Sequence, residues 1–148
     1  LASEDIGNAD PRGIMVADAA WTLTERVGMP ECRIILSQAT TYLALAPKSN
    51  AAYLAINEAM DDVRTARITP VPIYLRDPDK TRSAGSDVEA KGYEYAHDSK
   101  TRTSLGGVTA QSYMGVEKSY YRPKEVGWEQ SLKERLAEVK RARSRDDS

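Results

Sequence analysis

Few residues of this chain have the types and spacing that catalysis requires. His97 and Asp98 adjoin and could supply a general base, but no Gly-x-Ser-x-Gly turn presents a nucleophile to them. The alternative is a structural histidine, whose replacement would affect folding more than turnover. Asp61 and Asp62 also adjoin, but neighbours on a helix point in different directions. A solvated helix face is therefore favoured over a carboxylate pair.

Nucleotide and metal chemistry find no motif in the sequence. It contains no Gly-x-x-x-x-Gly-Lys-Ser/Thr loop to hold phosphates, and one His and one Cys cannot form a nitrogen–sulfur zinc site. Cys32 cannot form an internal disulfide, and its apolar helical pattern predicts a small buried side chain, with a reactive thiol as the alternative. We expect no catalytic, cofactor-binding or metal site in this chain.

Nucleic-acid binding has a better candidate, a segment in which rings and cations interleave. Such a segment can stack bases and neutralise phosphates, or it can pack a crossing chain onto a helical bundle. A net charge of −1 provides no overall basic field, so any DNA contact must be local. The basic cluster at 140–145 suits a solvated helix end, with DNA contact as the alternative. The candidate DNA-contact residues are Lys118, Tyr120, Tyr121, Arg122 and Lys124.

Composition places these residues in one soluble domain, 1–148. The chain has 41% hydrophobic and 29% charged residues, and 148 residues can bury a core without disulfides. No stretch approaches the roughly 18 apolar residues of a membrane span. The absence of a disulfide framework suits a reducing cytoplasm. The chain begins at Leu1 without Met, in a stretch that could end a helix, and we expect a fragment of a longer protein.

Three helices are expected to form the core, at about 10–66. The first begins at Asp10-Pro11 and ends at Gly28, the second runs from Pro30 to Pro47, and the third follows Ser49 as its N-cap. Short connectors predict an antiparallel bundle and an all-α fold. Apolar residues at helical spacing predict that the first helix is buried on two sides, through Val16, Ala20, Leu23 and Val27 on one face and Ile14, Ala17 and Trp21 on a neighbouring one. The packed faces of the other two helices are Cys32, Leu36, Ala39, Leu43 and Ala46, and Ala52, Ile56, Ala59 and Val63, with Tyr53 and Met60 beside them.

The turn between the second and third helices also contains the candidate contact residues. Pro47 stops one helix and Ser49 can cap the next. An exposed turn does not require the particular side chains Lys48 and Asn50. We therefore take Lys48, Ser49 and Asn50 as candidates for contact with a neighbouring subunit or another module.

The second half of the sequence lacks the regular helical spacing of the first half until its terminal helix. Pro70-Val71-Pro72 and the residues to Arg76 predict an extended segment, residues 77–90 a polar surface loop, and residues 92–121 irregular chain pinned by tyrosines. Together they form an irregular wrap at 67–123. A terminal helix is expected at about 124–143, with Trp128, Leu132, Leu136 and Val139 as a narrow apolar stripe.

Five segments, spread over nearly the whole chain, carry a family resemblance: Leu1–Pro11, Leu43–Tyr53, Pro70–Pro72, Gly92–Asp98 and Tyr120–Pro123. In this order they resemble the C-terminal region of the RarA (MgsA) family. This family comprises replication-associated recombination AAA+ ATPases, bacterial relatives of the Werner-helicase-interacting protein. One departure is the polar run 81–90, where the family usually has a short apolar helix, which puts that helix's contacts in doubt.

The resemblance implies a helical oligomerisation domain similar to the collar of clamp loaders. It implies an ATPase module and lid upstream, ATP and Mg²⁺ as that module's cofactors, homotetramer assembly, and a cytoplasmic, nucleoid-associated protein. DNA and single-strand-binding protein are the implied partners of the whole protein at stalled or gapped forks, in replication, recombination and repair. We expect this chain to be a non-enzymatic oligomerisation domain; the alternative is a module that binds single-stranded DNA or single-strand-binding protein.

Overall fold

The computed structural model describes residues 1–65, 67, 69–76, 108–109 and 111–144. Within these residues the chain is helical, with no strand, so the all-α prediction is confirmed. The elements are a π-helical turn η1 (Ala2–Ile6), 3-10 turns η2 (Gly7–Ala9) and η3 (Ile73–Leu75), and four α-helices, α1 (Arg12–Val27), α2 (Cys32–Leu45), α3 (Ala51–Arg64) and α5 (Glu129–Ser144).

The chain divides into two compact units. One contains residues 1–64 and 120–134, and the other contains residues 65–119 and 135–148. Helix α5 therefore begins in the first unit and continues into the second. The prediction of a single domain over 1–148 stays a prediction.

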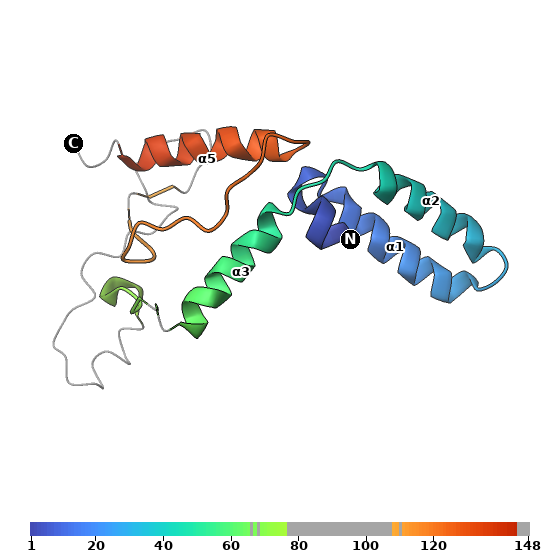
Figure 1. Ribbon diagram of the computed structural model, residues 1–148, viewed down its shortest axis with the longest axis horizontal. Helices are drawn as coiled ribbons and strands as arrows, with labels where there is room; N and C mark the ends of the chain where they lie inside the picture. Colours follow the sequence, from blue (N-terminus) through green and yellow to red (C-terminus); the bar gives the residue numbers. More distant parts are fainter. Residues whose placement is uncertain (66, 68, 77–107, 110, 145–148) are drawn as a thin grey trace. The chain divides into compact units, whose positions relative to one another are not determined.

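Helices α1 and α2 form the expected antiparallel pair in the first unit, side by side in Figure 1. Their ends follow the predicted signals. Asp10 accepts a hydrogen bond from the Arg12 backbone N–H, while Gly28 closes α1 at a φ of 72°. Both helices bury small residues, Ala20 on α1 and Ala39 on α2. The two backbones can therefore approach closely.

Helix α3 departs from the expected three-helix bundle. It packs on η1 and η2, the N-terminal turns, while α1 packs on α2 and η1. Ile6 lies at the centre of this arrangement, fully buried, and a methyl group on Gly13 would lie 3.2 Å from Ile6 Cγ2. The N-terminal turns therefore supply packing that the sequence assigned to the other two helices.

The terminal helix begins five residues later than expected, at Glu129. Gly127 adopts a φ of 54°, and the Trp128 N–H donates to the Ala9 carbonyl at 2.8 Å. A Cβ at Gly127 would lie 2.1 Å from the same oxygen, so only glycine permits this approach of two backbones. The tight turn at Gly127 therefore moves the start of α5 to Glu129.

In the second unit the described residues form turns and the later part of α5. The segment expected to be extended contains η3 instead, in which the Leu75 N–H donates to the Pro72 carbonyl. The Tyr74 hydroxyl donates to the Ser112 carbonyl, and Arg143 Nη2 donates to the Gln111 carbonyl at 3.1 Å. These hydrogen bonds connect three segments of that unit. The polar loop 77–90, the run 81–90 and most of the tyrosine-rich segment lie outside the described residues.

Candidate functional site

A buried carboxylate joins four segments of the first unit. Glu129 is fully buried and accepts hydrogen bonds from the Ser49 hydroxyl at 2.6 Å, the Tyr121 hydroxyl at 2.8 Å and the Lys124 backbone N–H at 2.8 Å. Asn8 Nδ2 in turn donates to Tyr121 Oη at 3.1 Å. Burial, followed by the bond to Glu129, raises the pKa of Tyr121 to about 12. Four distant parts of the sequence are thereby held together.

Residues 120–124, here called the crossing segment, bind one side of α3. Tyr120 Oη donates to Asp62 at 2.9 Å, Arg122 pairs with Glu58 through two hydrogen bonds of 2.7 and 3.2 Å, and Lys124 Nζ donates to Asn50 Oδ1 at 2.6 Å. As the segment advances from 120 to 124, its partners on the α3 side recede along the chain. The segment therefore runs antiparallel to α3.

Simple geometry explains this pairing. Alternate residues of an extended chain share a side and advance roughly 6.6 Å, while residues four apart on a helix share a side and advance about 6 Å. Tyr120 and Arg122 thus match Asp62 and Glu58. Tyr121, between them, points to Glu129 and Asn8. The alternation of side chains along this segment, which would suit stacking of bases, therefore also suits packing against α3.

These contacts support the packing interpretation of the ring-and-cation segment. Tyr120, Tyr121, Arg122 and Lys124 each have an internal partner, and Lys118 belongs to the second unit. Contact of these five residues with DNA stays a prediction. The expectation of a solvated face at the acidic pair was wrong for Asp62, which is 6% exposed.

The contact candidates between α2 and α3 also have internal partners. Lys48 Nζ donates to the carbonyls of Leu43, Ala44 and Ala46, where its charge complements the C-terminal end of α2. Ser49 is buried and accepts the Ala51 N–H at 3.3 Å, while Asn50, whose carbonyl accepts the Leu54 N–H, stands directly before α3. A subunit or module contact through Lys48, Ser49 and Asn50 stays a prediction.

The opposite side of α3 is apolar and exposed. The predicted core stripe of this helix is exposed by 57% at Ile56 and 56% at Val63, with Tyr53 and Met60 also exposed. The buried positions are Ala51 and Asp62, on the side that faces the N-terminal turns and the crossing segment. The prediction that the apolar stripe lies in the core was therefore wrong for a single chain.

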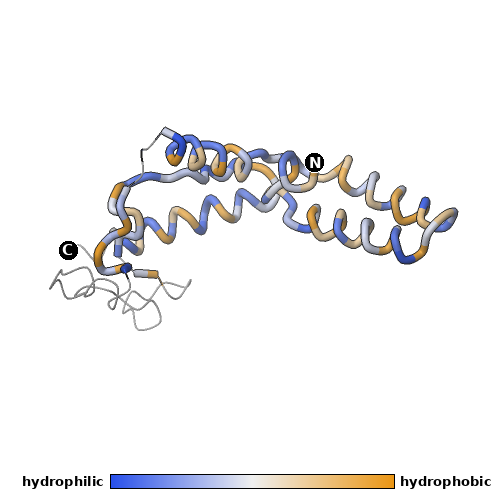
Figure 2. The backbone as a smooth tube through the Cα atoms, turned by 90° about the horizontal axis from the view of Figure 1, so that it is seen from below, coloured by the Kyte–Doolittle hydropathy of each residue, from blue (hydrophilic) through white to orange (hydrophobic). Residues whose placement is uncertain are grey.

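Helices α1 and α2 show the same pattern of small buried and large exposed residues. Ala20, Cys32, Ala39 and Ala46 lie in the core as predicted. The prediction was wrong for five other positions, which are exposed: Ile14, Trp21, Leu23, Val27 and Leu36. Figure 2 shows apolar residues recurring along both helices. Further exposed apolar side chains are Met15, Met29, Ile34 and Leu45.

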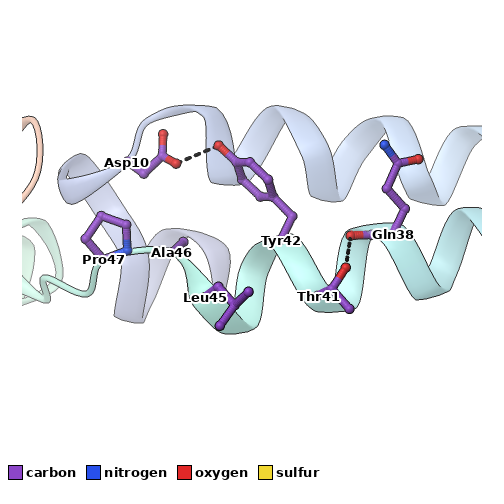
Figure 3. Close-up of a pocket in the computed structure, with 7 residues that line it drawn as sticks. All are labelled: Asp10, Gln38, Thr41, Tyr42, Leu45, Ala46 and Pro47. Atoms are coloured by element: carbon purple, nitrogen blue, oxygen red, sulfur yellow. Dashed lines mark hydrogen bonds between the residues drawn. The ribbon is translucent and has the colours of Figure 1, made fainter.

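An open hollow of 440 Å³ lies beside the end of α2. Figure 3 shows the Tyr42 ring reaching toward Asp10, where its hydroxyl donates to Oδ2 at 2.6 Å. Arg12 Nε donates to the same carboxylate at 2.8 Å. Arg12, followed by Tyr42, lowers the pKa of Asp10 to about 2. The Asp10 carboxylate is therefore already bound by side chains of the same chain. The hollow is lined by Asp10, Gln38, Thr41, Tyr42, Leu45, Ala46 and Pro47.

Among the described residues, the side chains considered for catalysis or metal binding do not form an active site. Cys32 is buried as expected, with Sγ 3.3 Å from Met29 Sδ. His97 and Asp98 lie outside the described residues. The part of the chain that the structure describes contains no cluster of three or more His, Cys, Asp or Glu suited to a metal, and none of its helices could span a membrane.

Sequence reasoning missed Glu129, Glu58 and the Asp10–Tyr42 pair. Glu129 has partners up to 80 positions away, and no local pattern indicates such a contact. Glu58 had a usable signal, because it lies one turn before Asp62 while Tyr120 and Arg122 alternate in the crossing segment.

Comparisons with known proteins agree on one family. Residues 1–140 match the family described as MgsA AAA+ ATPase C terminal. Replication-associated recombination protein A of Coxiella burnetii is 42% identical over 92% of this chain, and that of Escherichia coli is 42% identical over 93%; each match covers 30% of the relative. ATPase WRNIP1 of Dictyostelium discoideum is 34% identical over 70% of this chain and 12% of the relative. The chain therefore spans about a third or less of the length of these curated relatives. The family resemblance is confirmed: the chain belongs to the family described as MgsA AAA+ ATPase C terminal.

Proposed function

We propose that this domain joins copies of its AAA+ ATPase into a homo-oligomer, expected to be a tetramer. Upstream ATPase modules, with ATP and Mg²⁺, would then act jointly on DNA at replication forks, with single-strand-binding protein as a partner. The chain itself would be an assembly domain rather than an enzyme.

The observation that supports this proposal is that the chain buries mainly small apolar residues and exposes most of its large ones. The first unit buries alanines, Cys32 and Ile6, while Leu45 is 87% exposed, Ile34 74% and Trp21 69%. Burial of apolar surface drives association, and contiguous exposed apolar patches mark interaction sites. The single chain leaves apolar side chains exposed that further copies can cover.

DNA contact through the crossing segment is less well supported as a function of this domain. Its two tyrosines and Arg122 use their polar groups on Asp62, Glu129 and Glu58. A DNA-binding role would have to compete with these internal bonds.

Thermal unfolding at several protein concentrations tests the proposal. If folding is coupled to association, the midpoint Tm rises with protein concentration, because mass action favours the assembled native state. We expect such a rise over about a hundred-fold range of concentration. A midpoint that does not change over this range would contradict the proposal.

A further inference from the structure

The two sides of α3 have different partners within the chain. The inner stripe, Ala51, Ala55, Glu58 and Asp62, recurs at helical spacing and faces the N-terminal turns and the crossing segment. The outer stripe, Tyr53, Ile56, Met60 and Val63, lies on the opposite side of the helix and is 42 to 57% exposed. An amphipathic helix here uses its polar side inside the chain and presents its apolar side outward.

The inner contacts fix which side points outward. Glu58 is held by Arg122, Asp62 by Tyr120, and Asn50, just before the helix, by Lys124. Rotation of α3 to bury the outer stripe within its own unit would break all three. It would also expose the buried Ala51 and move Ser49, whose hydroxyl donates to Glu129. The outer stripe is thus presented by a braced helix.

The composition of the outer stripe suits a second copy of itself. No charged residue lies at positions 52, 53, 56, 59, 60 or 63, and Ala52 and Ala59 along one edge permit close approach of two backbones. In an antiparallel pair centred between Ile56 and Met60, each Ile56 lies over the partner's Met60, and each Tyr53 lies over the partner's Val63. The large Tyr53 side chain at one end of the stripe then meets the smaller Val63 at the other end, and the antiparallel helix dipoles attract each other. A two-fold interface needs this self-complementarity.

We infer that the α3 outer stripe is a two-fold subunit interface, occupied by the same stripe of a second copy in antiparallel orientation. This inference rests on the proposed function, since it assigns a surface to the assembly proposed there. In a tetramer with two kinds of two-fold interface, α3 pairs would form one kind. Loss of the α3 pairs would leave smaller assemblies.

Charge insertion tests the surface. The double variant Ile56→Glu, Met60→Glu keeps strong helix formers and adds charges only to the stripe. The control, Ser37→Glu, Thr40→Glu, adds the same charges to α2 at exposed positions that are already polar. Light scattering should show the mass of the α3 variant falling to half or less of the wild-type mass, while the control keeps the wild-type mass. Circular dichroism establishes that both variants remain helical.

The outcomes separate this inference from the proposed function. If wild type assembles and the α3 variant assembles equally well, the inference is wrong and the proposed function survives. If the control also dissociates, the assignment to α3 is contradicted as well. A monomeric wild type would overturn both.

Cross-linking tests the orientation. In a Cys32→Ala background, chains with Tyr53→Cys are mixed with chains with Val63→Cys and oxidised. Antiparallel stripes bring the two new thiols together, so mixed dimers linked between positions 53 and 63 should dominate. Predominant links between two Tyr53→Cys chains, or no links at all, would contradict the antiparallel pairing.

Discussion

The hydroxyl of Ser49 donates a 2.6 Å hydrogen bond to the fully buried carboxylate of Glu129, 80 positions later in the sequence. Ser49 also accepts the Ala51 N–H at the start of α3. One short side chain therefore connects the beginning of α3 to the beginning of α5. The bond makes the geometry of the two helix ends depend on each other.

Replacement of Ser49 by Ala should lower the free energy of unfolding by about 1–3 kcal/mol, because a buried carboxylate loses a donor. Chemical denaturation measures the change. Ser37→Ala, at an exposed position of α2, is the control and should stay within about 0.5 kcal/mol of wild type. Equal stability of the two variants would mean that the Ser49–Glu129 bond contributes little.

Two glycines with positive φ provide a matched pair of variants. Gly28 has no atom within 4 Å of an added Cβ, so Gly28→Ala reports backbone strain alone, about 1 kcal/mol or more. In Gly127→Ala the new methyl group meets the Ala9 carbonyl as well. We expect Gly127→Ala to be less stable than Gly28→Ala by over about 2 kcal/mol in denaturant titrations. Similar losses would contradict the close approach at Ala9.

The pKa of Asp10 predicts a loss of stability in acid. The folded-state pKa of about 2 lies below the ordinary value of 3.8, so the carboxylate stabilises the fold above about pH 4, and this contribution is lost as the pH falls toward 2. Asp10→Asn should be less stable at neutral pH and should lose less stability between pH 4 and pH 2. The measurement is unfolding across that range, with the exposed Asp18→Asn as the control for charge. Parallel profiles for Asp10→Asn and wild type would rule out this role.

The crossing segment should contribute little to DNA affinity. Arg122 forms two hydrogen bonds with Glu58, so Arg122→Ala should leave the binding of short single strands at low salt unchanged. Titrations at two salt concentrations measure this, with Arg33→Ala on α2 as the comparison. A loss of affinity specific to Arg122→Ala, with a shallower salt dependence, would support a DNA contact instead.

Local signals in the sequence were enough to place the first three helices. Asp10, Gly28, Pro47 and Ser49 mark their ends, because capping and proline geometry act within a few residues. The delayed start of α5 was not predictable, since the positive φ of Gly127 depends on the Ala9 carbonyl far away in the chain.

The sequence indicated one side of the α3 site and not the other. Periodicity found the apolar stripe of α3, but periodicity does not say whether the chain itself or another copy covers it. The opposite side of α3 binds Tyr120 and Arg122, and these contacts depend on how distant segments meet. The side chains first considered for DNA proved to be partners of this helix.

The mass of the wild-type chain in solution tests the central claim most directly. Light scattering at tens of micromolar should give a multiple of 16.3 kDa, with a tetramer as the expected species, because association covers the apolar residues that a single chain exposes. A single species of 16.3 kDa at those concentrations would contradict assembly through this domain.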